Sequence, residues 1–395
     1  MKSMEQILYR YNPWWEGEYK QEKMVERPII FSMLKKNLTI KQITILTGLR
    51  RVGKTTLMKQ VIQYLIVEKK VDPKLIFYAS LDDYLLANSN ILEIIEEYRK
   101  INGVAFSEKM YLFLDEVAYQ KDFELQLKNI YDQQIAKVYV SSSSASILKS
   151  KKAFLTGRNI VIEILPLDFE EYLQFKNIAI KKVDKHLLEG YFEDFMHTGG
   201  MPEYVLTGNS EYLKELVDDI VQKDIAAFYG VKDVQVLKDF FLLLMERSGK
   251  IISINKISKI MDISPDSAKR YLQMFVDSYL IFLVARFGKT NERILSAKKI
   301  YAADLGVRVH FTGFCDKGSL FENYVYLKIK KLNPSYVYQE GNEIDFLTEK
   351  KTLIEVKYNS EMPLPQAGLF NSINAKEKIL IKNIFDLAKL EGLEK

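Results

Sequence analysis

The sequence predicts an α/β fold in which a parallel sheet with intervening helices comes first and smaller modules follow it. Three observations predict this fold. An apolar, β-branched run at 40–46 leads directly into a glycine-bounded loop, and a helical pattern follows at 57–68. A second apolar run, 110–114, ends in two adjacent acidic residues. Further strand-like runs alternate with helical patterns, as in βαβ units; these runs are 75–79, 137–140 and 160–164.

Residues 48–55 fit the pattern G-x-x-x-x-G-K-[ST], which is the phosphate-binding loop. Gly48 and Gly53 permit a tight turn and let backbone N–H groups approach the phosphates, and the next helix adds the positive end of its dipole. Lys54 would reach the β- and γ-phosphates, and the Thr55 hydroxyl would bind Mg²⁺. The alternative is a chance glycine turn, which arises in about one per cent of chains of this length. The predicted nucleotide-binding residues are Gly48, Arg50, Arg51, Val52, Gly53, Lys54, Thr55 and Thr56.

The acidic pair after the run at 110–114 would complete a nucleotide site. Asp115 would hold Mg²⁺ through water, and Glu116 would orient the attacking water. Acidic residues at strand ends are common, so the pair alone does not indicate a nucleotide site. It does so because it follows the phosphate-binding loop at this distance along the chain. The strand predicted between the two motifs, and the glutamate beside the aspartate, favour a hydrolase over a simple kinase. The cofactors that these residues predict are ATP and Mg²⁺.

Two further features of this segment each have two interpretations. Ser141 and Ser143, after the strand 137–140, would sense the γ-phosphate or position water, but the serine run would equally cap a helix that starts at Ser146. Arg158 stands before the strand 160–164 and would act as an arginine finger that stabilises transition-state charge. A solvated arginine fits the same spacing.

Composition limits the classes of protein. A length of 395 residues predicts two to four domains, and 48% hydrophobic with 28% charged residues is ordinary for a soluble chain. Cys315 is the one cysteine, which excludes an intramolecular disulfide, and three scattered histidines argue against a zinc cluster, so we expect a cytoplasmic protein. No apolar run is as long as a membrane span, and the polar N-terminus does not resemble a signal peptide. The net charge of +5 is too small to indicate a nucleic-acid partner.

The rest of the chain divides into segments that differ in composition and in predicted secondary structure. Residues 1–25 are aromatic and charged, with Pro13-Trp14-Trp15, and are a candidate arm that packs on a neighbour. Helical patterns are predicted at 28–36, 91–101 and 123–131. The predicted domains are an N-terminal arm at 1–25, a nucleotide-binding domain at 26–165, a helical lid at 166–235 that is broken at 198–202, a winged helix at 236–312 and a small α/β domain at 313–395.

The winged helix is predicted from a helix-turn-helix that precedes a hairpin. A short helix at 254–261 is followed by Ser264-Pro265-Asp266, which has a capping serine, a proline at the first position and an acid in the first turn. The helix 266–278 would bury Ala268, Tyr271, Leu272 and Phe275. The hairpin strands are predicted at 280–287 and 299–302.

Basic residues outnumber acidic ones in this module, ten to four between 250 and 300. That surplus, which includes Lys298 and Lys299, suits a DNA phosphate backbone. The exposed Lys269 and Arg270 are the candidate DNA contacts. Winged helices also serve as protein docking modules and spacers, so this alternative stays open.

A second constellation lies near the C-terminus. Two predicted strands, 343–347 and 353–357, form a hairpin, and alternation places Glu355 and Lys357 on one strand face. Asp345 and Glu355 would share a divalent cation, with Glu322 from a helix, while Lys357 would position a water. This is the D…E-x-K arrangement of metal-dependent nucleases, and an ordinary charged hairpin is the alternative.

Together these motifs make the chain resemble the prokaryotic P-loop ATPases related to AAA+ and STAND proteins that carry a C-terminal restriction-endonuclease-like domain of the PD-(D/E)XK, DUF4143 type. The resemblance implies ATP, Mg²⁺ and a connection to DNA. One departure is Ser141-Ser142-Ser143, where the family usually has Thr-Gly-Ser, so the hydroxyls are kept and the glycine is lost. The resemblance is carried by 48–56, 114–117, 155–158, 166–171, 199–203, 223–225, 322–323, 343–346 and 355–357.

Three functional interpretations follow. In the first, the chain is an ATPase coupled to a DNA-binding or DNA-cutting tail. In the second, it is a slow nucleotide-dependent switch that exposes its tail to a protein partner. In the third, it is a nucleotide-binding scaffold with an inactive tail. ATP is the predicted ligand, DNA and a second copy of the chain are candidate partners, and no membrane is involved.

Overall fold

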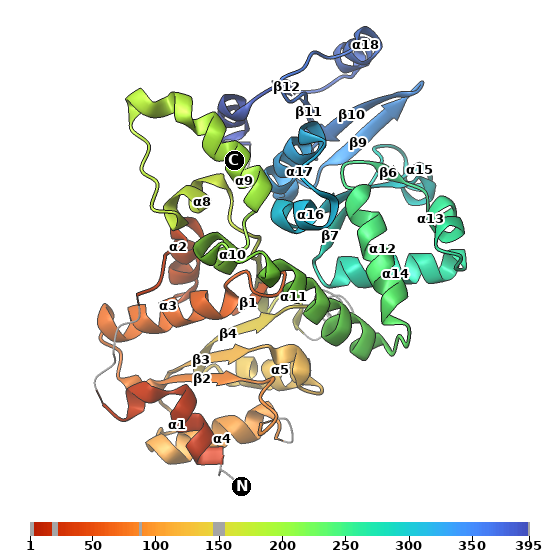
Figure 1. Cartoon of the computed structure of the whole chain (residues 1–395). Coiled ribbons are helices and arrows are strands. Elements are labelled where there is room, and N and C mark those ends of the chain that lie inside the picture. The colour runs from red at the N-terminus through yellow and green to blue at the C-terminus, as the bar shows by residue number, and fades with distance from the viewer. Residues whose placement is uncertain (1–3, 18–22, 87–88, 145–154, 394–395) are drawn as a thin grey trace. The chain divides into compact units, whose positions relative to one another are not determined.

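The computed structural model describes residues 4–17, 23–86, 89–144 and 155–393. It divides into two compact units, Met1–Ile164 and Leu165–Lys395 (Figure 1). Each unit has its own sheets and its own core, so each is described separately below.

The first unit is built on a parallel sheet with strand order β2-β3-β4-β1-β5. The strands predicted from the sequence are confirmed, with ends shifted by up to two residues, except that the run expected from residue 40 starts pairing three residues later, at Ile43. The strands are β1 Ile43–Thr47, β2 Ile76–Ser80, β3 Met110–Asp115, β4 Ala136–Ser142 and β5 Asn159–Glu163. The helices are α2 Pro28–Asn37, α3 Lys54–Val67, α4 Ile91–Asn102 and α5 Phe123–Gln133.

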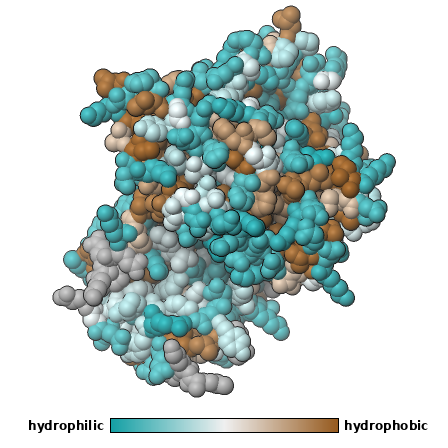
Figure 2. All heavy atoms as spheres, in the orientation of Figure 1, coloured by the Kyte–Doolittle hydropathy of each residue, from teal (hydrophilic) through white to brown (hydrophobic). Residues whose placement is uncertain are grey.

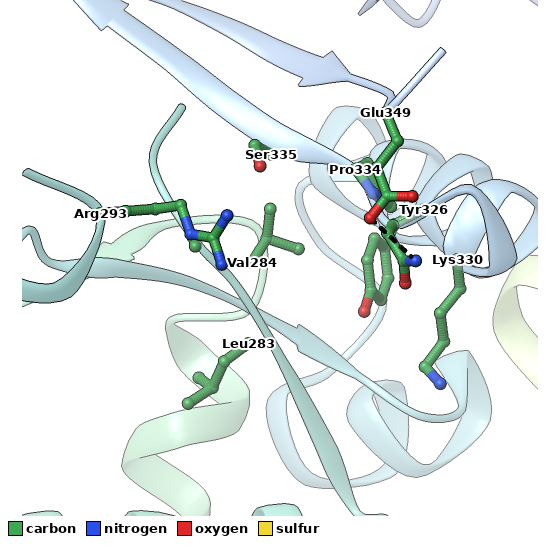
Figure 3. Close-up of a pocket in the computed structure, with 10 residues that line it drawn as sticks. Leu283, Val284, Arg293, Tyr326, Lys330, Pro334, Ser335 and Glu349 are labelled. Carbon is green, nitrogen blue, oxygen red and sulfur yellow. Dashed lines mark hydrogen bonds between the residues drawn. The ribbon is translucent and has the colours of Figure 1, made fainter. Parts of the chain in front are cut away.

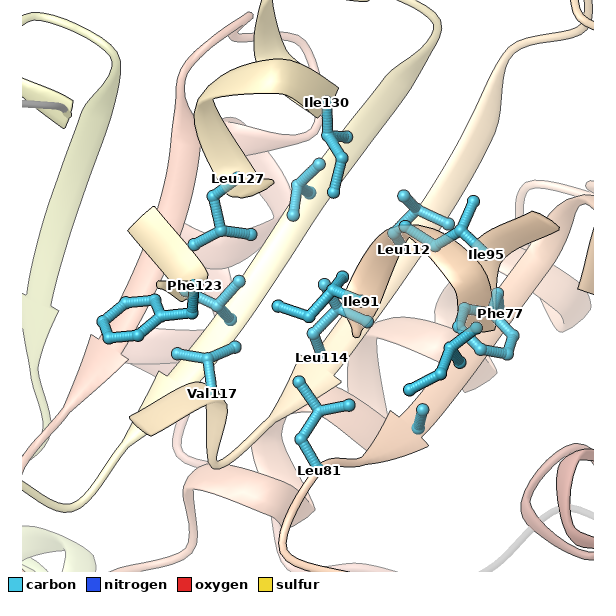
Figure 4. Close-up of a cluster of buried hydrophobic side chains, with 14 of the residues drawn as sticks. Phe77, Leu81, Ile91, Ile95, Leu112, Leu114, Val117, Phe123, Leu127 and Ile130 are labelled. Carbon is cyan, nitrogen blue, oxygen red and sulfur yellow. The ribbon is translucent and has the colours of Figure 1, made fainter. Parts of the chain in front are cut away.

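The core of the first unit lies where α4 and α5 pack on β2 and β3. Figure 4 shows Ile95 of α4 beside Phe77 and Leu112, Ile91 of α4 beside Leu114, and Leu127 and Ile130 on α5. Helix α4 begins with a capping box, in which Asn90 accepts from the Glu93 N–H and Glu93 accepts in return. This packing holds the carboxyl end of β3, where Asp115 lies, in a fixed position.

The N-terminal arm packs on β2 of its own chain. It consists of α1 Met4–Tyr11 and η1 Pro13–Trp15. The Asn12 side chain donates to the carbonyl oxygen of Tyr78 at 2.8 Å and accepts from the Tyr78 N–H at 2.7 Å. The indole N–H groups of Trp14 and Trp15 both donate to the carbonyl oxygen of Ile76, at 3.1 Å. The arm therefore satisfies the unpaired edge of β2, which would otherwise be open to other chains.

The second unit opens with helices, as expected for 166–235. They are α8 Phe169–Phe175, η4 Lys182–Leu187, α9 Leu188–Thr198, α10 Pro202–Thr207, α11 Glu211–Asp219, η5 Ile220–Ala227 and α12 Val234–Glu246. The break at 198–202 has a steric cause. A Cβ on Gly199, whose φ is +75°, would lie 2.3 Å from the Gly306 nitrogen at the start of α16 (Leu305–Thr312). Because Gly199 and Gly306 have no side chains, α9 can approach α16 closely.

A three-stranded antiparallel sheet of order β6-β8-β7 follows, with two helices before its β7–β8 hairpin. Ser264 caps α14, and Ala268, Tyr271, Leu272 and Phe275 are buried as predicted, while Lys269 and Arg270 are exposed. The sequence did not indicate β6 or the short helix α15 inside the hairpin. The elements are β6 Ile251–Ile252, α13 Ile254–Ile260, α14 Pro265–Asp277, β7 Ile281–Val284, α15 Thr290–Leu295 and β8 Lys298–Ala302.

The last segment forms a four-stranded sheet of order β12-β11-β10-β9. The predicted hairpin is confirmed as β10 and β11, whose register pairs Phe346 with Ile354. Its elements are α17 Lys317–Ile329, η6 Lys330–Leu332, β9 Ser335–Gln339, β10 Asn342–Leu347, β11 Thr352–Val356, α18 Leu364–Ser372, β12 Glu377–Ile381 and η7 Ile384–Leu390.

Hydrophilic residues cover much of the face seen in Figure 2, and hydrophobic residues lie among them in small groups. Among the described residues, no helix has the length and apolar character that crossing a bilayer requires.

Candidate functional site

The loop of residues 48–53 connects the carboxyl end of β1 to the start of α3. Gly48 has a φ of +138°, and a Cβ there would lie 2.2 Å from the carbonyl oxygen of Ile164. Gly53 has a φ of +94° and stands at the N-cap of α3. Both glycines are therefore required by the backbone path, and the loop lies against the first turn of a helix, where N–H groups have no helical partner.

Lys54 is buried beneath this loop. Its Nζ donates to the carbonyl oxygens of Gly48 at 3.1 Å and Leu49 at 3.0 Å. The same nitrogen lies 3.9 Å from Glu116 Oε1. The loop thus holds the ammonium group inside the turn, next to the acidic end of β3.

Asp115 is the centre of a network of hydroxyl groups. Its Oδ2 accepts from Thr55 Oγ1 at 2.6 Å and from the Tyr78 hydroxyl at 2.8 Å, and the Ser141 hydroxyl donates to Oδ1. Thr55 and Asp115, the residues predicted to hold Mg²⁺, are therefore side by side. A hydroxyl and a carboxylate supply the oxygen ligands that Mg²⁺ prefers, so the two residues fit this ion.

Tyr78 was not among the predicted site residues. It lies in β2, and its apolar neighbours gave it the pattern of a core side chain. Burial, with Asp115 as the next cause, raises the pKa of Tyr78 well above its ordinary value, so the phenol stays protonated and donates to Asp115. Arg27 was also missed: it is buried, and its guanidinium donates to the carbonyl oxygen of Val52 at 3.4 Å.

Glu116 follows Asp115 in a left-handed conformation, with φ +52°. Its Oε2 accepts from the Ser143 hydroxyl at 3.0 Å and from the Ser143 N–H at 3.2 Å, while its own N–H donates to Ser141 Oγ. Burial raises the pKa of Glu116 above its ordinary value, although Lys54 lowers it. A carboxylate that is more basic than usual is suited to hold a water or take its proton.

Both serines of the predicted sensor are thus engaged with the acidic pair, Ser141 with Asp115 and Ser143 with Glu116. The alternative role as a cap concerns a helix from Ser146, which lies outside the described residues. The half-buried side chain of Arg50, in the loop, donates to the Tyr119 hydroxyl at 2.9 Å.

Arg158 lies at the other end of the sheet. The Ile43 N–H, at the start of β1, donates to the carbonyl oxygen of Arg158 at 2.8 Å. The loop begins five residues further along β1, which is about 16 Å at the rise of a strand. The Arg158 side chain contacts Asp132 Oδ1 at 3.4 Å. The structure therefore does not bring Arg158 to the loop of its own chain.

The four residues predicted in the C-terminal segment do come together. Asp345 N–H donates to Glu355 Oε2 at 3.1 Å, the Val356 N–H donates to Asp345 Oδ2 at 3.0 Å, and Lys357 Nζ lies 2.8 Å from Glu355 Oε1. A fifth residue, Lys299, which was not among the predicted residues of this site, lies between two of them: its Nζ is 2.7 Å from Glu322 Oε1 and 2.9 Å from Asp345 Oδ1.

Lys299 is one of the ten basic residues that suggested DNA contact for the segment 250–300. It is buried, so it is not a surface charge. Arg286 and Lys298 are half-buried. Among the described residues, no group of three or more His, Cys, Asp and Glu side chains is arranged to hold a metal ion.

A separate pocket of about 390 Å³ lies in the second unit (Figure 3). Leu283 and Val284 from β7 line one side, and Lys330 and Glu349 line another; Glu349 accepts from the Asn333 amide at 3.2 Å. None of the predicted site residues lines it.

Comparison with known proteins agrees with the geometry of the first unit. Residues 40–173 match a family described as an AAA domain, and 189–317 match a domain of unknown function, DUF8612. The uncharacterized protein MJ1544 of Methanocaldococcus jannaschii is 30% identical over 383 residues, covering 91% of this chain and 82% of that protein. An uncharacterized protein of Haemophilus influenzae is 25% identical over 377 residues, covering 89% and 92%.

Solved structures resemble the chain more distantly. A Walker-type ATPase of Pyrococcus abyssi is 12% identical with a TM-score of 0.43, over 75% of this chain and 98% of that one. The ORC2 protein of Aeropyrum pernix is 13% identical with a TM-score of 0.40, over 80% and 97%.

Proposed function

Because the chain belongs to the same family as MJ1544 of Methanocaldococcus jannaschii and has an AAA domain at residues 40–173, we propose that it is a Mg²⁺-dependent ATPase. The nucleotide lies in the loop of residues 48–56. The observation that carries this proposal is the convergence of Lys54, Thr55, Asp115 and Glu116 at the carboxyl ends of β1 and β3.

Each of these side chains has a part in the proposed reaction. Bound Mg²⁺ supplies neutralisation of the charge that develops on the phosphate oxygens. Thr55 and Asp115 hold the ion, and Tyr78 fixes the Asp115 carboxylate by its hydrogen bond. Lys54 stabilises phosphate charge, and Glu116, held by Ser143, orients the attacking water.

The proposal is tested by phosphate release from ATP, measured with Mg²⁺ or with a chelator and with or without DNA. Mg²⁺-dependent turnover supports it, and stimulation by DNA supports an action on or near DNA. Absence of turnover with ATP tightly retained would instead favour the second candidate, a nucleotide-dependent switch that binds a protein partner. The hydrogen bonds that hold Glu116 favour hydrolysis over retention.

We propose further that residues 236–312 are a winged helix that binds DNA mainly through phosphates. Support comes from α13 and α14 followed by the β7–β8 hairpin, and from the exposure of Lys269 and Arg270 on α14. The double variant Lys269→Glu/Arg270→Glu is expected to weaken binding to all DNA sequences and to reduce the salt dependence, by about one unit of slope per lost phosphate contact.

Fluorescence anisotropy of labelled duplexes at several salt concentrations measures this effect. The matched control is Lys214→Glu/Lys232→Glu, which makes the same change of charge at exposed positions outside the module. Equal weakening in the control, or no affinity of the wild type at low salt, would leave the module as a docking or spacer domain.

Arg158 is proposed to act on a nucleotide held by a second copy of the chain. Arg158→Ala is then expected to slow ATP hydrolysis, and mixing it with Lys54→Ala should restore activity, because the Lys54 variant supplies an intact Arg158 to the other copy's intact loop. Asp132→Asn removes the charge that contacts both Arg158 and Lys128 and leaves Arg158 itself in place, so it is the control for a structural role. A lack of rescue on mixing would count against the finger.

The segment 313–395 is proposed to be a restriction-endonuclease-like module. Its support is the β10–β11 hairpin, which places Asp345 and Glu355 on one face beside Lys357. Whether such a module cleaves DNA depends on its ability to bind a metal ion, and the cluster around Lys299 bears directly on that.

A further inference from the structure

Lys299 comes from β8 and enters the carboxylate cluster of the segment 313–395 from outside it. Its Nζ lies 2.7 Å from Glu322 Oε1 on α17 and 2.9 Å from Asp345 Oδ1 on β10, and it also forms an ion pair with Glu343. The lysine side chain is only 2% exposed. A lysine is almost never buried to this degree unless it is paired, so the three carboxylates account for its position.

The surroundings keep the ammonium group charged and fixed. Burial alone would lower the pKa of Lys299, but Asp345 and Glu322 outweigh it and raise the pKa well above its ordinary value. Tyr301 lies two residues further along β8, on the same strand face, and its hydroxyl donates to Glu322 Oε1 at 2.5 Å. The cation is therefore held by the strand, and its carboxylate partner is held by a second group of that strand.

A divalent ion does not fit the same place. Mg²⁺ requires oxygen ligands at about 2.1 Å in a near-octahedral arrangement. Here the space between Glu322 and Asp345 holds an ammonium nitrogen at hydrogen-bonding distance from both. Further oxygens of Asp345 and Glu355 are engaged as well: Asp345 Oδ2 accepts from Val356 N–H, and Glu355 accepts from the Gln366 amide at 2.7 Å.

We propose that Lys299 is a built-in cation that takes the place of a divalent metal ion in this cluster, so that the segment 313–395 holds its carboxylates together without metal and does not cleave DNA. The ion pairs also fasten β8 of the preceding module to the C-terminal sheet. The inference rests on the proposed nuclease-like module, but it is independent of ATP hydrolysis.

The charge balance of the cluster agrees with this proposal. Four carboxylates, those of Glu322, Glu343, Asp345 and Glu355, face the two ammonium groups of Lys299 and Lys357. Burial, followed by the charge of Asp345, raises the pKa of Glu322 to about 7 and that of Glu355 to about 8. Near neutral pH these two groups carry reduced negative charge, so the lysines offset most of what remains.

The test counts Mn²⁺ bound to the full chain without nucleotide, from the electron paramagnetic resonance signal of the free ion. Wild type and Asp345→Asn are expected to bind the same number of ions, because the cluster takes none. Lys299→Met, which keeps an unbranched side chain one atom shorter and removes its charge, is expected to gain about one ion per chain. The second substitution in Lys299→Met/Asp345→Asn should remove that gain.

Three results would overturn the proposal. The first is that the wild type binds an ion that Asp345→Asn does not bind. The second is that the wild type cleaves DNA and Asp345→Asn does not. The third is that Lys299→Met folds but gains no ion. If circular dichroism shows that Lys299→Met does not fold, the comparison of wild type with Asp345→Asn decides the question alone. Neither measurement depends on ATP turnover, so failure of this inference and failure of the ATPase proposal are distinguishable.

Discussion

Lys54→Ala is expected to reduce ATP hydrolysis by on the order of 10²–10³-fold, the cost of removing one fixed group that stabilises developing charge. The physical reason is the position of the ammonium, which the carbonyl oxygens of Gly48 and Leu49 hold inside the loop. Alanine leaves no positive charge there for the β- and γ-phosphates. Steady-state phosphate release and binding of a fluorescent ATP analogue measure the two consequences separately.

The matched control is Lys59→Ala, which removes a lysine from the same helix at a position outside the loop. It should turn over ATP at the wild-type rate. Thermal melting of both variants checks that the loss is not one of folding, since Lys54 is buried and its removal leaves two carbonyl oxygens without this donor. Unchanged affinity and turnover in Lys54→Ala would show that the loop does not hold the phosphates.

Glu116→Gln is expected to bind ATP normally and to hydrolyse it at least tenfold more slowly, which is roughly 1.4 kcal/mol of barrier. Glutamine has the size to keep the contact with Ser143, but it cannot take a proton from the attacking water. Glu96→Gln, at an exposed position on α4, is the control and should be neutral. Wild-type turnover in Glu116→Gln would mean that another group positions the water.

The dependence on pH gives a second measure of the same group. The ionised form of Glu116 is the working form, so the rate should fall as pH decreases through its pKa. Because burial raises that pKa, the fall should lie above the pH range of an ordinary glutamate. This acidic limb should be present in the wild type and absent in Glu116→Gln.

Features that depend on contiguous residues were predictable. In three places a short sequence pattern forms one local structure. These are the loop of residues 48–56, the acidic pair at 115–116 and the capped helix after Ser264. The same holds for the hairpin that carries Asp345 and Glu355, because alternation along two strands determines which side chains share a face. The bounds of these elements were close to those in the structure for the same reason.

Features that depend on distant partners were not predictable. The hydrogen bond from Tyr78 to Asp115 joins strands 37 residues apart, and a tyrosine in an apolar strand resembles any core residue. The aromatic character of the arm, residues 4–15, was evident from the sequence. The edge of β2, on which the arm packs, was not. Arg158 was assigned by analogy of position, and only the parallel register of β5 with β1 shows that it lies far from its own loop.

The sequence by itself therefore determined the chemistry available to this protein: a phosphate-binding loop, an acidic pair at the end of a strand, two exposed basic residues on one helix and a set of carboxylates near the C-terminus. The tertiary structure decided what those carboxylates surround. Lys299 has the pattern of a surface lysine in a basic hairpin, and by sequence alone it is one of the ten basic residues that suit a DNA backbone. Its burial among Glu322, Glu343 and Asp345 arises from packing between segments that are up to 46 residues apart, and it places a fixed ammonium where a metal ion was expected.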